Sequence, residues 1–522
     1  MVIDLLLRNA TVIDGTGSDG FPADVAVEGG RIARVGRIEG VEATRTIEAA
    51  GRIITPGFID VHTHSDGPLL RQANFAAKTS QGFTTELLML DGIAYAPVSA
   101  ENWREWFVYL RALDGLRLDD YRGWTTIEDY MRCVDGATAQ NALPLVAYGN
   151  VRALVLGFGP GPIDDYQSML VSGEVARGMR AGAAGLSTGL DYLAQWHATT
   201  DELVDACRAI APFSGIYVTH VRYKRGLRRA LDEAVDIARR ADVPLHLSHL
   251  KAVGDMSADD LFEFLGKCER EVDVSFDLYP YQSGSTMLHF MLPYEVWCDG
   301  PLATLPKLAD PQVRRRVAEG LQRHRVQLDR IRIAWVTTAD NKIHQGRTVA
   351  QYVADTGRSP ADALCDLLIE ERLAVLAVFV EGDDEAAFPL LEHDRFMLGS
   401  DGIFFAESAA HPRVCGSATR LLQRAVQGRT RRSLGGIIHR MTQFPAERFG
   451  LTERGVVRAG YWADLVVWNP EQVADRATYE NPNRMSAGID FVLVNGTPVV
   501  DNGAVIEFQN GGAPGRRLWF RA

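Results

Sequence analysis

The chain contains little cysteine, and none of it is arranged in pairs. Its 522 residues include six cysteines, which are scattered and form no Cys-x-x-Cys motif. This pattern argues against a disulfide framework and fits reduced thiols, so we expect a cytoplasmic protein. The sequence also lacks a basic N-terminal segment with a following apolar run, and it has no apolar stretch long enough to cross a bilayer. We therefore expect neither a signal peptide nor a membrane partner.

An excess of positive charge is absent as well. Lys and Arg number 55 against 67 Asp and Glu, which gives a formal net charge of -12. This balance disfavours nucleic acid and anionic membranes as main partners. With 46% hydrophobic and 23% charged residues, the composition is that of a globular protein long enough for more than one domain. We expect a small-molecule substrate, and the sequence leaves a homo-oligomer open.

The middle of the chain alternates apolar strands with amphipathic helices. Strand patterns occur at residues 57–64, 85–90, 142–148, 185–190, 215–221, 244–250, 272–279 and 395–400. Helical periodicity appears between several of them, at residues 201–211, 226–240 and 257–268. Strands that alternate with helices in this way predict an α/β fold, a (β/α)8 TIM barrel.

The two ends of the chain have a different pattern, in which short strands are joined by glycine-rich turns. We predict that residues 1–55 and 452–522 pair into one small β-sandwich domain and that residues 56–451 form the barrel. The stretch from about 282 to 390 is too long for a single connection. We expect it to be an insertion with its own strands, at residues 332–336 and 374–380, that covers the site as a lid.

Histidine and aspartate stand at the ends of the predicted strands, where the chemistry of such barrels collects. His62 and His64 are one residue apart on a strand, so their side chains point the same way. Each by itself is more often structural, but successive strand ends carry the same residue types. The strand-end residues are His62, His64, Asp91, His220, His249 and Asp401.

Imidazole and carboxylate ligands suit Zn²⁺ with water in an open position. A metal of this kind lowers the pKa of its water to about 7 and polarises a carbonyl. Asp401 is the candidate general base, which would take the proton of water and return it to a leaving nitrogen. The alternative is that Asp401 is only a turn residue in Ser400-Asp401-Gly402.

The segments around these residues resemble the amidohydrolase superfamily, and within it the N-acyl-D-amino-acid deacylase (D-aminoacylase) family. They follow the family's order along nearly the whole chain, at residues 56–66, 81–85, 183–192, 219–222, 248–251, 277–281, 399–402, 411–413 and 460–467. The resemblance implies a metal-dependent barrel with a terminal β-sandwich, and an enzyme that hydrolyses linear amides.

The resemblance also implies roles for individual residues. His220 and His249 would hold one tight zinc, and His62 and His64 would flank a second, weaker metal position. Asp401 would be the general base. The candidate substrate-binding residues, which would hold a carboxylate or line the pocket, are Lys251, Tyr281, Ser283, Ser285, Arg222 and Tyr192. For Lys251, a solvated lysine at the barrel mouth is the alternative.

The chain departs from the family pattern at three places. Asp91 stands where the family often has a zinc-binding cysteine, and it either ligates through oxygen, which we favour, or is a turn residue. Ala147-Tyr148-Gly149 replaces a Gly-His-Gly, and Tyr223-Lys224 replaces acidic residues. These changes leave the substrate and the number of metals open.

Two competing functions remain at this point. A cyclic amide hydrolase related to dihydroorotase or hydantoinase shares the His-x-His pattern, but residues 185–190 offer no lysine on the fourth strand, where those enzymes usually carry one. A catalytically inactive binding protein is disfavoured because the four histidines and Asp401 are all present.

Overall fold

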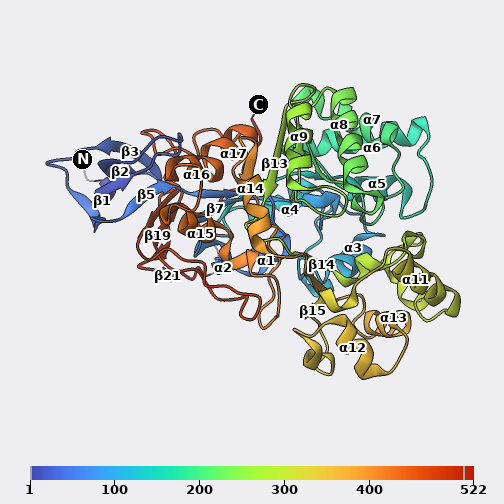
Figure 1. The fold of residues 1–522 in the computed structure, drawn as a ribbon. Helices are drawn as coiled ribbons and strands as arrows, with labels where there is room; N and C mark the ends of the chain where they lie inside the picture. Colours follow the sequence, from blue (N-terminus) through green and yellow to red (C-terminus); the bar gives the residue numbers. More distant parts are fainter. Residues whose placement is uncertain (1–2, 510–511, 522) are drawn as a thin grey trace.

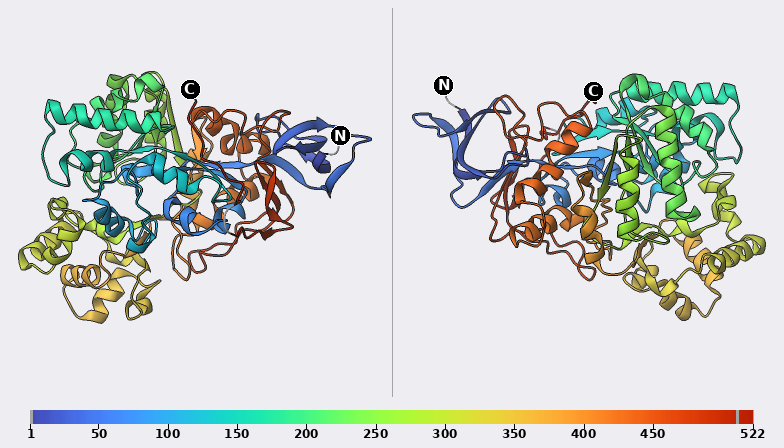
Figure 2. Two further views of the ribbon diagram at one scale, coloured as in Figure 1. Left: turned by 180° about the vertical axis from the view of Figure 1, so that it is seen from behind. Right: turned by 45° about the horizontal axis from the view of Figure 1, so that its top comes forward.

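The computed structural model describes residues 3–509 and 512–521 of the chain. The strands contributed by the two termini lie at one end of the molecule, and the inserted helices around α11 to α13 project at another (Figure 1). The barrel lies between them, and the two further views show the same arrangement (Figure 2). In the described part of the chain, no helix is both long and apolar enough to cross a membrane.

The barrel is a ring of parallel strands, as predicted. One part contains β6 (Phe58–Asp60), β7 (Phe83–Leu88) and β8 (Asn141–Pro144), in that order. The other contains, in spatial order, β9 (Val146–Ala147), β10 (Gly185–Gly189), β11 (Ile216–His220), β12 (Leu245–Leu247), β13 (Val274–Leu278) and β17 (Phe396–Leu398). The chain runs from β8 into β9 past one residue, and the ring closes where the Val61 amide donates to the Leu398 carbonyl.

The helices cover the outside of the ring because each has one apolar face. In α8 the buried positions recur every three or four residues, and this stripe packs on the strands. The helices outside the insertion are α1 (Asp66–Arg71), α2 (Ala76–Thr79), α3 (Trp103–Leu110), α4 (Ile127–Val134), α5 (Tyr148–Leu156), α6 (Asp165–Arg180), α7 (Thr200–Arg208), α8 (Leu227–Ala241), α9 (Ala258–Cys268), α14 (Phe388–Leu391), α15 (Arg413–Val426), α16 (Leu434–Met441) and α17 (Gln443–Arg448).

Apolar side chains fill the barrel interior and close the end opposite its mouth. A separate core cluster collects residues from β6, β7, β8, β11 and β17 together with Phe449 and Leu451, which follow α17. Its members on or next to the barrel strands include Ile59, Leu87, Leu143, Ala184, Ile216, Val218 and Met397. The barrel is therefore a packed core rather than an open channel.

The terminal β domain is one nine-stranded sheet built from both ends of the chain. Its strands are β1 (Ile3–Val12), β2 (Phe21–Glu28), β3 (Arg31–Gly36), β4 (Ala43–Glu48), β5 (Ile53–Pro56), β18 (Leu465–Trp468), β19 (Ile489–Val494), β20 (Thr497–Asp501) and β21 (Ala504–Val505). β18 pairs antiparallel with β5, so the predicted pairing of the termini is confirmed. The exact domain boundaries stay predictions.

The inserted segment between β13 and α14 has its own sheet, as predicted. Its three strands are β14 (Gly284–Met287), β16 (Leu376–Phe379) and β15 (Ile331–Trp335), with β16 in the middle. Its helices are α10 (Pro301–Lys307), α11 (Pro311–Arg323), α12 (Val349–Thr356) and α13 (Pro360–Glu370). Movement of this segment as a lid stays a prediction.

A buried ion pair connects the first and last barrel strands beneath the mouth. Lys78 donates to Asp60, at the end of β6, and to Ser400, just after β17. Asp60 also accepts from the Ser400 amide at 2.8 Å. The nearby carboxyl of Glu86 is buried, and burial raises its pKa to about 7 while the charge of Lys78 opposes that rise. The positive charge of Lys78 therefore compensates the buried carboxylate of Asp60, which holds the end of β6 against the segment after β17.

We predict that Lys78→Met lowers the free energy of unfolding by about 3–5 kcal/mol, because it leaves buried carboxylates without a cation. Urea unfolding measures this change. Lys267→Met, which breaks an exposed pair with Glu263 in α9, is the control and should cost less than about 1 kcal/mol. A Lys78 variant as stable as the control would contradict the role of this pair.

Candidate metal centre and active site

The structure brings six strand-end residues together at the mouth of the barrel. His62 and His64 lie after β6, Asp91 after β7, His249 after β12 and Asp401 after β17, while His220 is the last residue of β11. All of them are buried. The strand that carries the histidine pair ends at Asp60, earlier than predicted, but a bridge between Thr63 and Gly402 holds the segment of the two histidines beside the end of β17.

The backbone at three of these positions adopts a conformation that few non-glycine residues take. Asp91, His249 and Asp401 have positive φ angles of 56°, 37° and 47°. Residues held in this region store strain, and such residues cluster at functional sites. At Asp91 the sharp turn directly after β7 directs the carboxylate toward the histidines.

Two sets of potential metal ligands share Asp91. One set is His62, His64 and Asp91, and the other is Asp91, His220 and His249; within each set the ligand atoms lie within 4.8 Å of one another. Asp91 Oδ1 is 3.5 Å from His62 Nε2 and 3.9 Å from His249 Nε2. Asp91 Oδ2 is 3.7 Å from His64 Nε2. One carboxylate thus faces both histidine pairs.

Buried atoms in this cluster have no partner within the protein. His62 Nε2 and Asp91 Oδ1 are buried and make no hydrogen bond. Buried polar atoms are normally paired, so unpaired ones that converge on a common point indicate a ligand there. Nitrogen and oxygen donors in this arrangement fit a divalent metal such as zinc.

A second group lies behind each imidazole on the side away from the centre. His62 Nδ1 is 3.2 Å from Asp277, and His249 Nδ1 is 3.2 Å from the Tyr223 hydroxyl. His220 Nε2 and His64 Nδ1 each face a carboxylate oxygen at 3.8 Å, from Asp191 and Asp114 respectively. Partners of this kind orient metal-binding histidines.

Asp277 links the metal cluster to the barrel wall. Its second contact is His246 Nε2 at 3.0 Å, and His246 Nδ1 lies 2.8 Å from the Ser275 hydroxyl. His246 is fully buried, and its contacts with Asp277 and Ser275 give it a structural role inside the barrel.

Asp401 is held in its ionised form beside the ligands. Burial by itself would raise the pKa of Asp401, but the Arg413 guanidinium, 2.8 Å from its carboxylate, and the nearby histidines keep that pKa well below its usual range. Asp401 Oδ1 lies 3.2 Å from His64 Nε2. An ionised carboxylate at this place can accept a proton.

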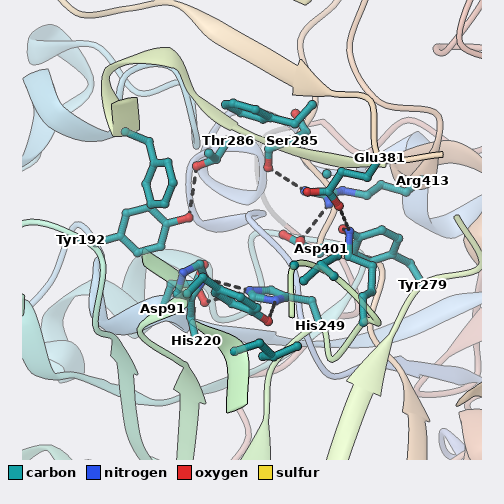
Figure 3. Close-up of a pocket in the computed structure, with 18 of the residues that line it drawn as sticks. Asp91, Tyr192, His220, His249, Tyr279, Ser285, Thr286, Glu381, Asp401 and Arg413 are labelled. Carbon is teal, nitrogen blue, oxygen red and sulfur yellow. Dashed lines mark hydrogen bonds and ion pairs between the residues drawn. The ribbon is translucent and has the colours of Figure 1, made fainter. Parts of the chain in front are cut away.

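A cavity of about 460 Å³ opens above the metal cluster. Figure 3 shows its residues, with Asp91, His220 and His249 on one side and Arg413, Glu381 and Tyr279 on the other. Of the predicted substrate-binding residues, Lys251, Tyr192 and Ser285 line this cavity. Lys251 is buried, in disagreement with the alternative of a solvated lysine.

The other three predicted substrate contacts do not line the cavity. Arg222 donates to Glu233 at 2.9 Å and to carbonyls of the 190–198 loop. The Tyr281 hydroxyl donates to Asp475 at 2.6 Å. Ser283 presents its carbonyl to Lys251 and His411 rather than its hydroxyl to the cavity. Their substrate-binding roles stay predictions that this geometry does not favour.

Sequence reasoning missed Tyr279, Arg413 and Glu381, which do line the cavity. Tyr279 and Arg413 lie inside segments that matched the family, so a closer look at those motifs could have found them. Glu381 belongs to the inserted segment and carries no motif.

Two of the residues that depart from the family pattern have partners within the protein. The Tyr148 hydroxyl donates to Glu202, and Lys224 Nζ donates to the Phe290 carbonyl at 2.7 Å.

Comparisons with known proteins agree with this site. The chain is 33% identical over 501 residues to a D-aminoacylase of Alcaligenes xylosoxydans xylosoxydans, covering 95% of this chain and 94% of that protein. The crystal structure of an N-acyl-D-glutamate deacylase from Bordetella bronchiseptica, complexed with zinc and a phosphonate inhibitor, matches with a TM-score of 0.83 and 29% identity over 99% of this chain and 100% of that one. A D-aminoacylase with a binuclear metal centre matches with a TM-score of 0.81 and 31% identity over 99% and 100%.

The model of the amidohydrolase family matches residues 45–500, which include every residue of the metal cluster. This match covers most of the chain. The fold of the chain is that of the D-aminoacylase structures. The chain is a member of the amidohydrolase family, related over its full length to N-acyl-D-amino-acid deacylases.

Proposed function

We propose that the protein is a zinc-dependent hydrolase that removes the acyl group from N-acyl-D-amino acids. The observation that carries this proposal is the shared position of Asp91 between two histidine pairs, with the ionised Asp401 beside them. The full-length relatedness to D-aminoacylase supports the substrate class.

Different residues of the site bind the metal and transfer the proton. His62, His64, Asp91, His220 and His249 would hold zinc, in one tight position and a second, weaker one, and zinc supplies Lewis acidity and lowers the pKa of water. Asp401 accepts a proton from the attacking water, whose oxygen bonds to the acyl carbon. Asp401 then returns the proton to the nitrogen as the C–N bond breaks.

Lys251 and Tyr279 form the wall that receives the substrate's α-carboxylate. Lys251 Nζ lies 2.9 Å from the Tyr279 hydroxyl, and both groups face the cavity. Burial by itself would lower the pKa of Lys251, but Tyr279 and Glu381 raise it, so the lysine stays charged. A buried cation beside a phenol suits a carboxylate.

We expect hydrolysis of N-acyl-D-amino acids when zinc is supplied, with slower or no hydrolysis of the L-isomers and of cyclic amides. A screen of these three substrate sets, with release of the free amine as readout, checks this. Turnover of cyclic amides alone would favour the hydantoinase-like alternative, although β10 (Gly185–Gly189) contains no lysine.

Asp401→Asn should lower kcat by at least ~100-fold and leave the zinc content unchanged, because an amide cannot accept the proton. Zinc is measured by elemental analysis of the same preparation that is assayed. Unchanged turnover in this variant would end the role of Asp401 as base.

Asp91→Cys should raise zinc affinity, because a thiolate is a softer ligand than a carboxylate. Competition with a chromophoric chelator measures the dissociation constant. If zinc binds the variant and the natural protein equally, Asp91 is a turn residue and the metal is held by histidines alone.

A further inference from the structure

The inserted segment places a carboxylate directly on the predicted anchor of the substrate. Glu381, two residues beyond β16, has its Oε2 3.3 Å from Lys251 Nζ (Figure 3). The Lys251 side chain is 8% exposed and that of Glu381 is 38% exposed. Glu381 thus stands between the buried lysine and the open mouth of the cavity.

Lys251 is surrounded by four acceptors while Glu381 is in place. Its ammonium donates to the Tyr279 hydroxyl at 2.9 Å and to the Gln282 carbonyl at 2.8 Å, and its third proton lies between Glu381 at 3.3 Å and the Ser283 carbonyl at 3.4 Å. A substrate carboxylate can bind Lys251 only by displacing Glu381. The exposure of Glu381 permits that exchange, since its carboxylate can turn toward water at the mouth.

The other charges of the cavity offer nothing to a second carboxylate. Among the described residues that line it, the cations other than histidine are Lys251 and Arg413. Arg413 pairs with Asp401 at 2.8 Å and donates to the Ser285 carbonyl at 3.0 Å, and its Nε, which has no hydrogen-bond partner, is buried. Asp255 adds a further negative charge and accepts from the Leu227 amide at 2.9 Å.

Apolar neighbours strengthen the effect of Glu381 on a bound substrate. Phe379, the last residue of β16, lines the cavity beside it together with Phe290 and Val253. Their rings and methyl groups reduce the amount of water on the cavity side of Glu381, and charges interact more strongly where there is less water.

We infer that Glu381 sets the charge preference of the enzyme: it admits N-acyl-amino acids with neutral or cationic side chains and rejects those with acidic side chains. One α-carboxylate replaces Glu381 on Lys251, whereas a second carboxylate meets the displaced Glu381 and finds no accessible lysine or arginine among the described residues that line this cavity. This inference rests on the proposed function. It matters because the relatives include both a D-aminoacylase and an N-acyl-D-glutamate deacylase at similar identity.

The test compares three substrates of similar length whose side chains are cationic, neutral and anionic: Nα-acetyl-D-lysine, N-acetyl-D-methionine and N-acetyl-D-glutamate. The zinc-loaded natural protein should hydrolyse the glutamate derivative least, with the difference mainly in KM. Glu381→Gln should raise kcat/KM for the glutamate derivative relative to the methionine derivative by about tenfold or more, and should lower the relative value for the lysine derivative.

Glu385→Gln is the matched control, because Glu385 lies on the same segment, pairs with Arg424 and does not line the cavity. Glu385→Gln should leave the relative kcat/KM values of the three substrates unchanged. Calorimetric binding of free D-methionine and D-glutamate to each zinc-loaded variant provides a readout that does not require turnover, and Glu381→Gln should narrow the preference for D-methionine.

The outcomes separate the two claims. The role of Glu381 is overturned if Glu381→Gln and the natural protein hydrolyse the three substrates with the same relative kcat/KM values. It is also overturned if the natural protein prefers the glutamate derivative. Either result leaves the proposed function standing. If no N-acyl-amino acid is hydrolysed and neither free amino acid binds, both claims are overturned.

Discussion

The structure depends on the burial of four imidazoles and one shared carboxylate at the mouth of a packed barrel. Asp91 faces both histidine pairs, and atoms of this cluster remain without partners although they are removed from water. A buried polar group without a partner costs free energy, and so does an uncompensated buried charge. A cation bound among these atoms satisfies them together, which is why we place the chemistry there.

The surrounding structure holds this cluster in position from two sides. Below it, the interior of the barrel is filled by apolar side chains, so the strand ends cannot shift inward. Behind it, Asp277 contacts His62 and His246 and accepts from the His249 amide at 2.9 Å. One buried carboxylate therefore fixes ligands from two different strands and ties them to a third, which is the kind of support that a precise metal site needs.

Much of the fold and of the metal cluster could be predicted from the sequence, because both follow from local patterns. Apolar strands that end in His220 or His249 can be recognised one at a time, and parallel strands bring their ends to one mouth. The substrate pocket could not be predicted in the same way. Tyr279 and Tyr281 are two residues apart around Pro280, and only the turn decides that Tyr279 faces the cavity while Tyr281 meets Asp475. Glu381 reaches Lys251 across 130 residues, through the pairing of an inserted sheet that no local pattern specifies.

The most direct test of the central claim is a crystal structure of the zinc-loaded protein with anomalous diffraction data at the zinc edge. The account predicts an anomalous peak about 2.0–2.2 Å from an Asp91 oxygen and from imidazole nitrogens of His220 and His249. A well-ordered zinc bound elsewhere, or an ordered cluster with no peak among these side chains, would contradict it.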